Sequence, residues 1–455
     1  MKKLYCLLIV AIAAALLSGC FDNGSTSSPP AGFTATPGDG RVMLTWIPDP
    51  SVEYWIFTAT DPSLTAFNWT SLANAHAYID TATPFYMCGL LTSTAGSINW
   101  TPYYFAANGR SSNGPGGASS PTIIETPYNA STYWHAGSVG SSTDLYGVGY
   151  ASLTTCSNNT TSAAGSFAAV GSSGAIFTST DGVTWTTPTS VPSGLPDLYA
   201  VTGYAANLNN PTTPGIVWIA VGAGGASIYS YDGITWYNGG ALNTNTNSLR
   251  SITHSGSTFI AVGDTGTILS ASAPGITLSG ISWTTQNSGS SSNLYGVSHG
   301  NFYTAVGEYG TILTSLTGAS NTWTAQTPAT SETLRQVATN GNITVAVGDN
   351  GTIVTSTDGG VQWIAQYLQG SVTPNLVSVT AESQVVADAL TDPALGYVPY
   401  AQFVALDSSG NAYTSVNGVN WSGPVTTGIS SPNALVSSGF GYVAAGNAGT
   451  TAYAF

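Results

Sequence analysis

One sequence pattern recurs seven times along the chain. A typical copy contains a Leu-x-x-Val segment, an aromatic residue followed by Ala-Val-Gly, a Gly-x-Ile segment and then a tryptophan. The leucines that begin the copies are Leu145, Leu198, Leu249, Leu294, Leu334, Leu376 and Leu435. They lie 40 to 59 residues apart. Short strands and glycine turns that repeat at this period predict an all-β chain with a seven-bladed β-propeller.

Each copy predicts four strands. The Leu-x-x-Val segment is expected to be innermost, followed outward by the Ala-Val-Gly and Gly-x-Ile segments, with the tryptophan on the outer fourth strand. The last copy ends at Phe455 without a tryptophan, whereas Trp134 lies 11 residues before the first repeat leucine. Residues 131–135 are therefore expected to supply the missing outer strand, which closes the ring and removes its open sheet edges.

The N-terminus has the features of an export signal. Two lysines precede an apolar run, which predicts a secretory signal peptide over residues 1–19. The sequence Leu17-Ser18-Gly19-Cys20 resembles the lipobox of bacterial lipoproteins. That resemblance implies a lipid on Cys20, a lipidated linker over residues 20–28, and anchoring in the outer membrane, facing the periplasm or the cell surface. A cleaved signal with an incidental cysteine is the alternative.

Two further cysteines lie outside the signal and the lipobox, Cys88 and Cys156. An exported compartment permits them to form a disulfide, which would join the N-terminal domain to an insertion in the first blade. Two buried free thiols are the alternative.

A separate domain is expected over residues 29–126, before the propeller at residues 127–455. Apolar and polar residues alternate on both sides of Gly38-Asp39-Gly40, which predicts a hairpin. With Trp46 as core tryptophan and an apolar strand over residues 103–108, the pattern resembles a fibronectin type III domain. The resemblance implies a β-sandwich that serves as a spacer or contacts protein or glycan.

The charge of the chain argues against nucleic acid as a partner. After Cys20 there is no lysine and there are only four arginines, against 20 acidic residues in the chain. Phosphate binding requires clustered lysine and arginine.

A second motif precedes the repeat tryptophans. It has the form Ser179-Thr180-Asp181-Gly182-Val183-Thr184-Trp185 and recurs before Trp236, Trp363 and Trp421. It resembles the Asp-box of sialidase-type propellers, in which the acidic residue caps its own turn. Together with segments such as Ala346–Ile353, it makes residues 131–455 resemble the photosystem II assembly-factor propellers. That resemblance implies a non-catalytic scaffold that holds a client protein, without a cofactor.

No catalytic or metal site is expected. Sialidase chemistry uses three arginines, and the propeller contains two. Asp264, Glu308 and Asp349 occupy the same hairpin position in three copies, which indicates turn residues rather than the carboxylate pair of a glycosidase. His254 and His299 share a register but are too few for a metal site, and no metal-binding or phosphate-loop motif is present.

The position after each repeat leucine is the candidate partner-contact site. It is occupied by Tyr146, Tyr199, Arg250, Tyr295, Arg335, Val377 and Val436. Tyrosine and arginine are enriched in interface hot spots, and equivalent positions form a ring near one mouth of a propeller. The alternative is that these side chains only pack between blades.

These features predict a non-catalytic, lipid-anchored scaffold or assembly factor that binds another envelope or surface protein through the propeller face. The membrane is contacted through the lipid. A surface adhesin or glycan-binding module is the alternative, and a degenerate sialidase-like hydrolase is a third.

Overall fold

The computed structural model describes residues 28–38, 41–49, 51–72, 75–80, 85–87, 102–110, 118–125, 131, 133–151, 165–206, 215–239, 246–272, 276–277, 280–341, 343–368, 373–383, 401–439 and 441–455. These residues form strands, turns and 3-10 turns, and none of them is α-helical. No helix in this part of the chain has both the length and the hydrophobicity needed to cross a bilayer. The predicted signal peptide and the cysteines Cys20, Cys88 and Cys156 lie outside the described residues.

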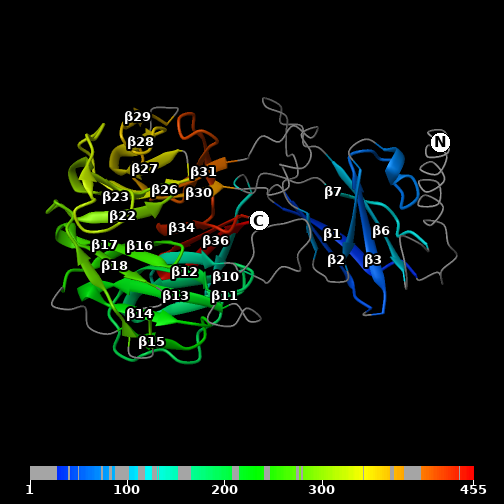
Figure 1. The fold of residues 1–455 in the computed structure, drawn as a ribbon, viewed down its shortest axis with the longest axis horizontal. Helices are drawn as coiled ribbons and strands as arrows, with labels where there is room; N and C mark the ends of the chain where they lie inside the picture. Colours follow the sequence, from blue (N-terminus) through cyan, green and yellow to red (C-terminus); the bar gives the residue numbers. More distant parts are fainter. Residues whose placement is uncertain are drawn as a thin grey trace, which may run out of the picture. The chain divides into compact units, whose positions relative to one another are not determined.

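The described residues divide into two compact units, one with the residues up to 125 and one with those from 131 onward. The first unit consists of two antiparallel sheets (Figure 1). One has the order β1 (Ala31–Gly38), β2 (Arg41–Ile47), β5 (Phe85–Met87), and the other β4 (His76–Asp80), β3 (Glu53–Ala59), β6 (Tyr103–Arg110), β7 (Ile123–Glu125).

One apolar core is shared by these two sheets. Alternate residues of β2, including Leu44 and Trp46, cluster with Ile56 of β3 and Phe105 of β6 because successive side chains of a strand point to opposite faces. Pairing of Gly38 with Arg41 confirms the predicted hairpin, and the burial of Trp46 confirms its place in the core.

In the second unit, the described residues form seven consecutive antiparallel sheets, numbered here 1 to 7. Their first strands are β9 (Leu145–Ala151), β12 (Leu198–Ala206), β16 (Leu249–Ser255), β22 (Leu294–His299), β26 (Leu334–Thr339), β30 (Leu376–Ser383) and β34 (Pro432–Ser437). The second strands are β10 (Ser166–Gly171), β13 (Gly215–Gly222), β17 (Thr258–Gly263), β23 (Tyr303–Gly307), β27 (Thr344–Gly348), β31 (Ala401–Asp407) and β35 (Tyr442–Gly446).

The third strands are β11 (Ile176–Ser179), β14 (Ser227–Ser230), β18 (Ile268–Ser272), β24 (Ile312–Ser315), β28 (Ile353–Ser356), β32 (Asn411–Ser415) and β36 (Thr450–Ala454). The fourth strands, in sheets 2 to 7, are β15 (Trp236–Asn238), β21 (Thr284–Gln286), β25 (Thr324–Ala325), β29 (Ile364–Gln366), β33 (Ser422–Thr426) and β8 (His135–Ser138). Sheet 1 has three described strands, and Thr186 adds only an isolated bridge to Thr178. A small hairpin of β19 (Ile276–Thr277) and β20 (Gly280–Ile281) interrupts sheet 3.

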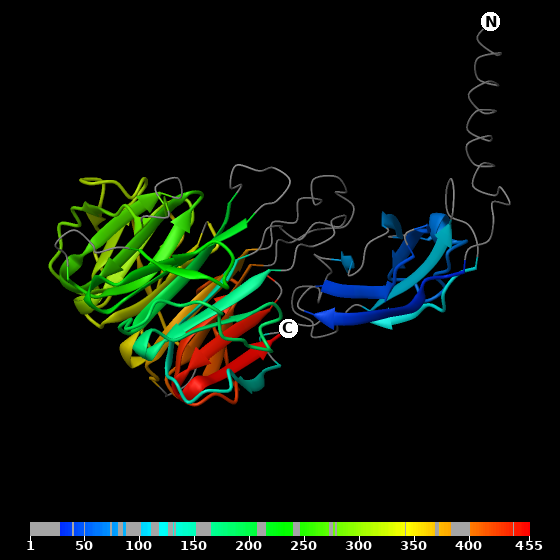
Figure 2. The ribbon, with the colours of Figure 1, turned by 90° about the horizontal axis from the view of Figure 1, so that it is seen from below.

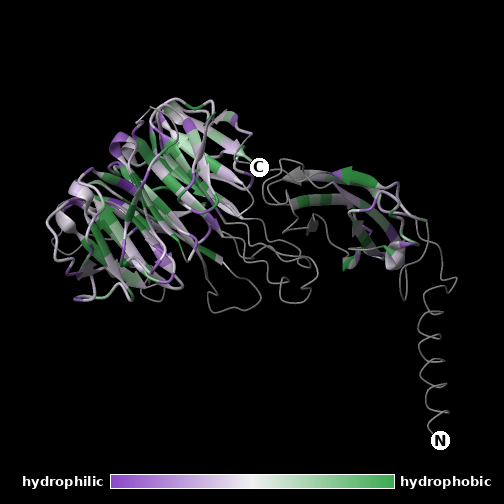
Figure 3. Ribbon diagram, turned by 90° about the horizontal axis from the view of Figure 1, so that it is seen from above, coloured by the Kyte–Doolittle hydropathy of each residue, from purple (hydrophilic) through white to green (hydrophobic). Residues whose placement is uncertain are grey.

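The seven sheets form a closed cycle, which is the arrangement of a β-propeller. Each first strand contacts the first strands of the two neighbouring sheets, and β34 of sheet 7 contacts β9 of sheet 1. In Figures 1 and 2 the red C-terminal strands accordingly lie beside the green and cyan strands of sheet 1. Apolar residues concentrate in the strands and polar residues in the turns (Figure 3). The second strands are the most buried, with Ala168, Ala169 and Val170 fully buried in sheet 1.

The last sheet is completed by the start of the unit. Strand β8 pairs antiparallel with β36 from Ser138↔Thr450 to His135↔Tyr453, and the ring of Trp134 lies 6.3 Å from that of Tyr442. The predicted closing pair is therefore confirmed, but the strand covers residues 135–138 rather than 131–135. The reason is that repeat tryptophans generally come just before the fourth strand and fill the space at its start.

The seventh copy begins at a different residue from the one expected. In the other sheets the repeat leucine pairs with the residue that ends the second strand, as Leu249 pairs with Gly263. In sheet 7 this place belongs to Pro432, which pairs with Gly446, whereas Leu435 pairs with Ala444. Leu435 thus occupies the valine position of Leu-x-x-Val, and its assignment as a repeat leucine is wrong. Proline fits here because the first residue of a strand need not donate a ladder hydrogen bond.

The predicted capping role of the Asp-box residues is confirmed. In sheet 1, Asp181 Oδ1 accepts hydrogen bonds from the amides of Val183 and Thr184, at 2.8 and 2.7 Å. Gly182 has φ +74°, and an added Cβ would lie 2.6 Å from the ring of Phe455. Glycine is needed for both reasons, and the turn thereby packs closely on sheet 7.

The tryptophans bind back to these turns. The indole nitrogens of Trp236, Trp363 and Trp421 donate to the carbonyl three residues earlier, at 3.0–3.2 Å. Each ring is buried in an apolar cluster, so the indole satisfies its polar group while filling the wide outer part of the sheet.

Replacing Trp421 by alanine tests this packing. The side chain is 2% exposed, so Trp421→Ala should lower the free energy of unfolding by about 3–5 kcal/mol. Tyr367→Ala is the matched control, because Tyr367 is 81% exposed. Urea denaturation of both variants measures the difference, and equal losses would contradict the assigned role of the tryptophan.

Candidate functional site

The candidate contact residues share one structural position, a bulge at the start of each first strand. In sheet 3, Leu249 pairs with Gly263 and Ser251 with Val262, so that Arg250 between them has no partner in the ladder. The same shift occurs in sheets 1, 2, 4, 5, 6 and 7. A bulge redirects the side chain of its extra residue. The five predicted residues therefore lie at equivalent ends of five consecutive sheets.

In sheet 7 the bulge residue is Asn433, not the expected Val436, because the copy starts at Pro432. Asn433 Nδ2 donates to the carbonyl oxygen of Leu145 in sheet 1 at 2.8 Å, which links the last sheet to the first at this end. We call this end of the sheets the mouth face. It comprises the bulges and the turns between second and third strands, such as residues 264–266 and 308–310.

The five aromatic and basic side chains form two chains of contacts. The ring centroids of Tyr146 and Tyr199 are 5.7 Å apart, and the guanidinium carbon of Arg250 lies 4.7 Å from the centroid of Tyr199. The guanidinium of Arg335 lies 5.3 Å from the centroid of Tyr295. Stacking of a guanidinium on an aromatic face is a favourable cation–π contact. Each arginine therefore rests on the tyrosine of the preceding sheet.

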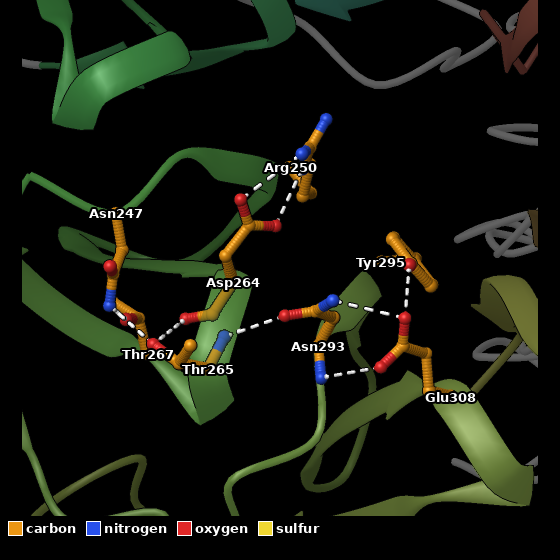
Figure 4. A network of polar contacts seen from close by, with 8 residues as sticks. All are labelled: Asn247, Arg250, Asp264, Thr265, Thr267, Asn293, Tyr295 and Glu308. Atoms are coloured by element: carbon orange, nitrogen blue, oxygen red, sulfur yellow. Dashed lines mark hydrogen bonds and ion pairs between the residues drawn. The ribbon is translucent and has the colours of Figure 1, made fainter.

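Both arginines are also held by a carboxylate of their own sheet. Arg250 donates from Nε and Nη2 to the two carboxylate oxygens of Asp264 at 2.8 and 3.1 Å (Figure 4). Arg335 makes the same two bonds to Asp349 at 2.9 and 2.8 Å. These bonds raise the pKa of each arginine above its usual range. Bidentate ion pairs of this kind fix the orientation of the guanidinium as well as pairing its charge.

Glu308 takes the equivalent position in sheet 4, where the bulge residue is a tyrosine. Its carboxylate accepts hydrogen bonds from the Tyr295 hydroxyl at 2.8 Å and from Asn293 Nδ2 at 3.0 Å (Figure 4). These bonds lower the pKa of Glu308, and the bond from Tyr295 has the largest effect. The three acidic residues expected to be turn residues thus each begin a 3-10 turn and bind the bulge residue of the same sheet.

Sequence reasoning missed a contact between neighbouring sheets. The residue directly before the repeat leucine is Asp or Asn in four sheets, namely Asp144, Asp197, Asn293 and Asn375. Each Oδ1 accepts the amide hydrogen of the left-handed residue in the preceding sheet's turn, which is Ala448, Ser173, Thr265 or Asn350, at 2.8–3.0 Å. The repeated Asp/Asn-Leu pair was the available signal. We call this contact the inter-sheet cap.

The two histidines that share a register lie away from the mouth face. Burial lowers the pKa of both His254 and His299. The rings contact aromatic neighbours, Tyr204 and Phe259 for His254 and Tyr303 for His299. Among the described residues, no group of three or more His, Cys, Asp or Glu side chains is arranged to hold a metal ion.

No protein-family model matches this sequence, and no curated protein matches it. Solved structures of similar fold include YCF48 bound to a D1 peptide, with 15% identity and a TM-score of 0.50 over 70% of this chain and 94% of that chain. YCF48 from Cyanidioschyzon merolae is another, with 13% identity and a TM-score of 0.49 over 70% and 98%. The first of these confirms the β-propeller fold.

The inter-sheet cap can be tested at Asp197. Asp197→Ala removes the acceptor of the Ser173 amide and should lower the free energy of unfolding by about 0.5–1.5 kcal/mol. Asp197→Asn should retain most of that stability, because asparagine makes the same bond in sheets 4 and 6. Denaturant midpoints of the two variants provide the comparison, and indistinguishable losses would disprove the cap.

The hydrogen bonds to Glu308 predict a pH dependence of stability. Because folding lowers the pKa of Glu308 below 4.5, its stabilisation is present above pH 4.5 and is lost as the pH falls through the lowered value. Glu308→Gln does not titrate. The stability difference between wild type and this variant should therefore shrink as the pH falls below 4.5. Parallel urea-midpoint profiles for the two proteins would contradict this.

Proposed function

We propose that this protein is a non-catalytic scaffold of the cell envelope that binds another protein through the mouth face. The observation that carries the proposal is the set of five tyrosine and arginine side chains that five consecutive sheets bring to one face. Their mutual stacking and the two ion pairs hold them in place. Side chains that are ordered before binding lose less entropy when a partner docks.

The YCF48 structure with a D1 peptide supports a protein as the partner, since a propeller of similar fold accommodates a polypeptide. The fold likeness supports the mode of binding and not the identity of the client. In our proposal, the partner of this chain is an envelope or surface protein.

The proposal includes the rest of the chain. Residues 1–19 direct export, Cys20 carries the lipid anchor in the outer membrane, and residues 29–126 form a fibronectin type III spacer. The orders β1-β2-β5 and β4-β3-β6-β7 around a core tryptophan support that domain type. The seven sheets that contact in a cycle support a complete seven-bladed ring.

The double variant Tyr146→Ala/Tyr199→Ala tests partner binding. Loss of two interface tyrosines at about 2 kcal/mol each should weaken binding of the partner by roughly a thousandfold and so abolish its recovery from envelope extracts. Tyr237→Ala is the control, because Tyr237 is a partly exposed tyrosine on the outer strand β15. Affinity capture with quantitative mass spectrometry measures recovery, and thermal unfolding checks that both variants are folded.

Unchanged recovery with the mouth variant would refute the proposed surface. Hydrolysis of a glycosidase substrate by the wild-type chain, abolished by Glu308→Gln, would refute the non-catalytic assignment. Binding to a glycan array without capture of a protein would favour the adhesin alternative.

A further inference from the structure

The charges of the propeller unit are divided unequally between its two faces. Among the described residues from 131 onward there are eleven carboxylates, and seven of them lie on the mouth face: Asp144, Asp197, Asp264, Glu308, Glu332, Asp349 and Asp407. Three others, Asp181, Asp232 and Asp358, cap Asp-box turns at the opposite ends of the sheets. Glu382 is buried.

The two arginines do not make this face an anion receptor. Arg250 and Arg335 are the only lysine or arginine residues from residue 131 to the end of the chain. Each already forms a bidentate ion pair with a carboxylate of its own sheet. An acidic partner would have to compete with Asp264 and Asp349, and it would meet the remaining carboxylates as like charges.

Four carboxylates of the mouth face form no ion pair with a cation among the described residues, although Glu308 is close enough to Arg335 to act on its charge. Asp144 and Asp197 accept backbone amides, Glu332 accepts the Asn350 side-chain amide, and Glu308 accepts Tyr295 and Asn293. All these donors are neutral, so they orient the carboxylates without cancelling their charge. Asp407 differs because it is buried and bound by four donors of its own strand region.

A second observation is that this face already binds guanidinium groups. Arg250 lies between the ring of Tyr199 and the carboxylate of Asp264, and Arg335 lies in the same way between Tyr295 and Asp349. In sheets 1 and 2 the bulge residues are Tyr146 and Tyr199, and the negative charges of Asp197 and Asp144 act on the Tyr146 hydroxyl. The ring of Tyr199 is already covered by Arg250. Tyr146 therefore offers the same two kinds of group, an aromatic ring and nearby carboxylates, with no cation–π partner among the described residues.

We propose that the mouth face binds a lysine- and arginine-bearing segment of its partner protein, and that Asp144 and Asp197 beside Tyr146 are the main contacts for the basic side chains. This inference rests on the proposed function and specifies the chemistry of the partner. Carboxylates attract basic side chains, and tyrosine rings add cation–π contact.

The chain provides well-matched variants for a test. Asp144→Asn/Asp197→Asn removes two negative charges but keeps both inter-sheet caps, because Asn293 and Asn375 make the same bond elsewhere. Asp232→Asn is the control for charge on the opposite face. It keeps its turn, since Asn417 caps the corresponding Asp-box turn in sheet 6.

The experiment measures binding of the full chain to two labelled peptides by fluorescence anisotropy. One is a short peptide rich in lysine and arginine, and the other has glutamate in place of every basic residue. We expect the basic peptide to bind more tightly at about 50 mM salt and to weaken strongly at about 500 mM, where charges are screened. Asp144→Asn/Asp197→Asn should weaken its binding by about two- to thirtyfold, whereas Asp232→Asn should leave it unchanged.

The proposal is overturned if the acidic peptide binds as tightly, if neither peptide binds, or if both Asn variants have the same effect. Capture of the natural partner distinguishes failure of this inference from failure of the proposed function. If Tyr146→Ala/Tyr199→Ala abolishes capture and Asp144→Asn/Asp197→Asn does not weaken it, the mouth face binds a protein but not through basic groups.

Discussion

The pairing of β8 with β36 is the interaction on which the propeller depends. Six sheets can form from consecutive chain segments, but sheet 7 acquires its outer strand from residues that precede sheet 1. Three further contacts join sheet 7 to sheet 1. Asn433 binds the Leu145 carbonyl, Asp144 binds the Ala448 amide, and Gly182 packs on Phe455. Two of these contacts, the inter-sheet cap and the packing of an Asp-box glycine on the neighbouring sheet, also occur between other sheets.

A closed ring with a repeated bulge also explains the candidate site. Each bulge turns one side chain out of the ladder, and the cycle of sheets brings these side chains to the same face. Whether such a residue is tyrosine or arginine then determines which neighbours it can bind. Where it is arginine, the first residue of the following turn is aspartate, and the pair compensates its own charge. Where it is tyrosine, the charge of nearby carboxylates remains.

Much of this architecture could be predicted from sequence because it repeats. The repeated pattern of leucine, Ala-Val-Gly and tryptophan predicts strands, glycine turns and large buried rings. Because the pattern recurs, each copy supports the prediction made for the others. The first residue of the seventh copy was predicted wrongly because Leu435 matches the motif by residue type, whereas the register depends on pairing with Gly446. The inter-sheet caps were missed because they join residues that are 24 to 304 positions apart, and only the cycle brings them together.

The candidate site shows the same division. The five tyrosine and arginine positions follow from counting one residue past each leucine. The sequence did not predict that the two arginines are paired with carboxylates. Arg250 and Asp264 become partners only because the bulge and the following turn bring them together. The pairing reverses the simple interpretation of two arginines as a binding site for acidic groups.

The position of β8 has a consequence for biogenesis. This strand is synthesised before the other described strands of the propeller unit, yet its ladder partner, β36, is the last of them. Until β36 is available, both β8 and sheet 7 have unpaired edges, which favour intermolecular association. The ring can therefore close only after β36 has been made, and loss of β36 would open the junction rather than remove a peripheral turn.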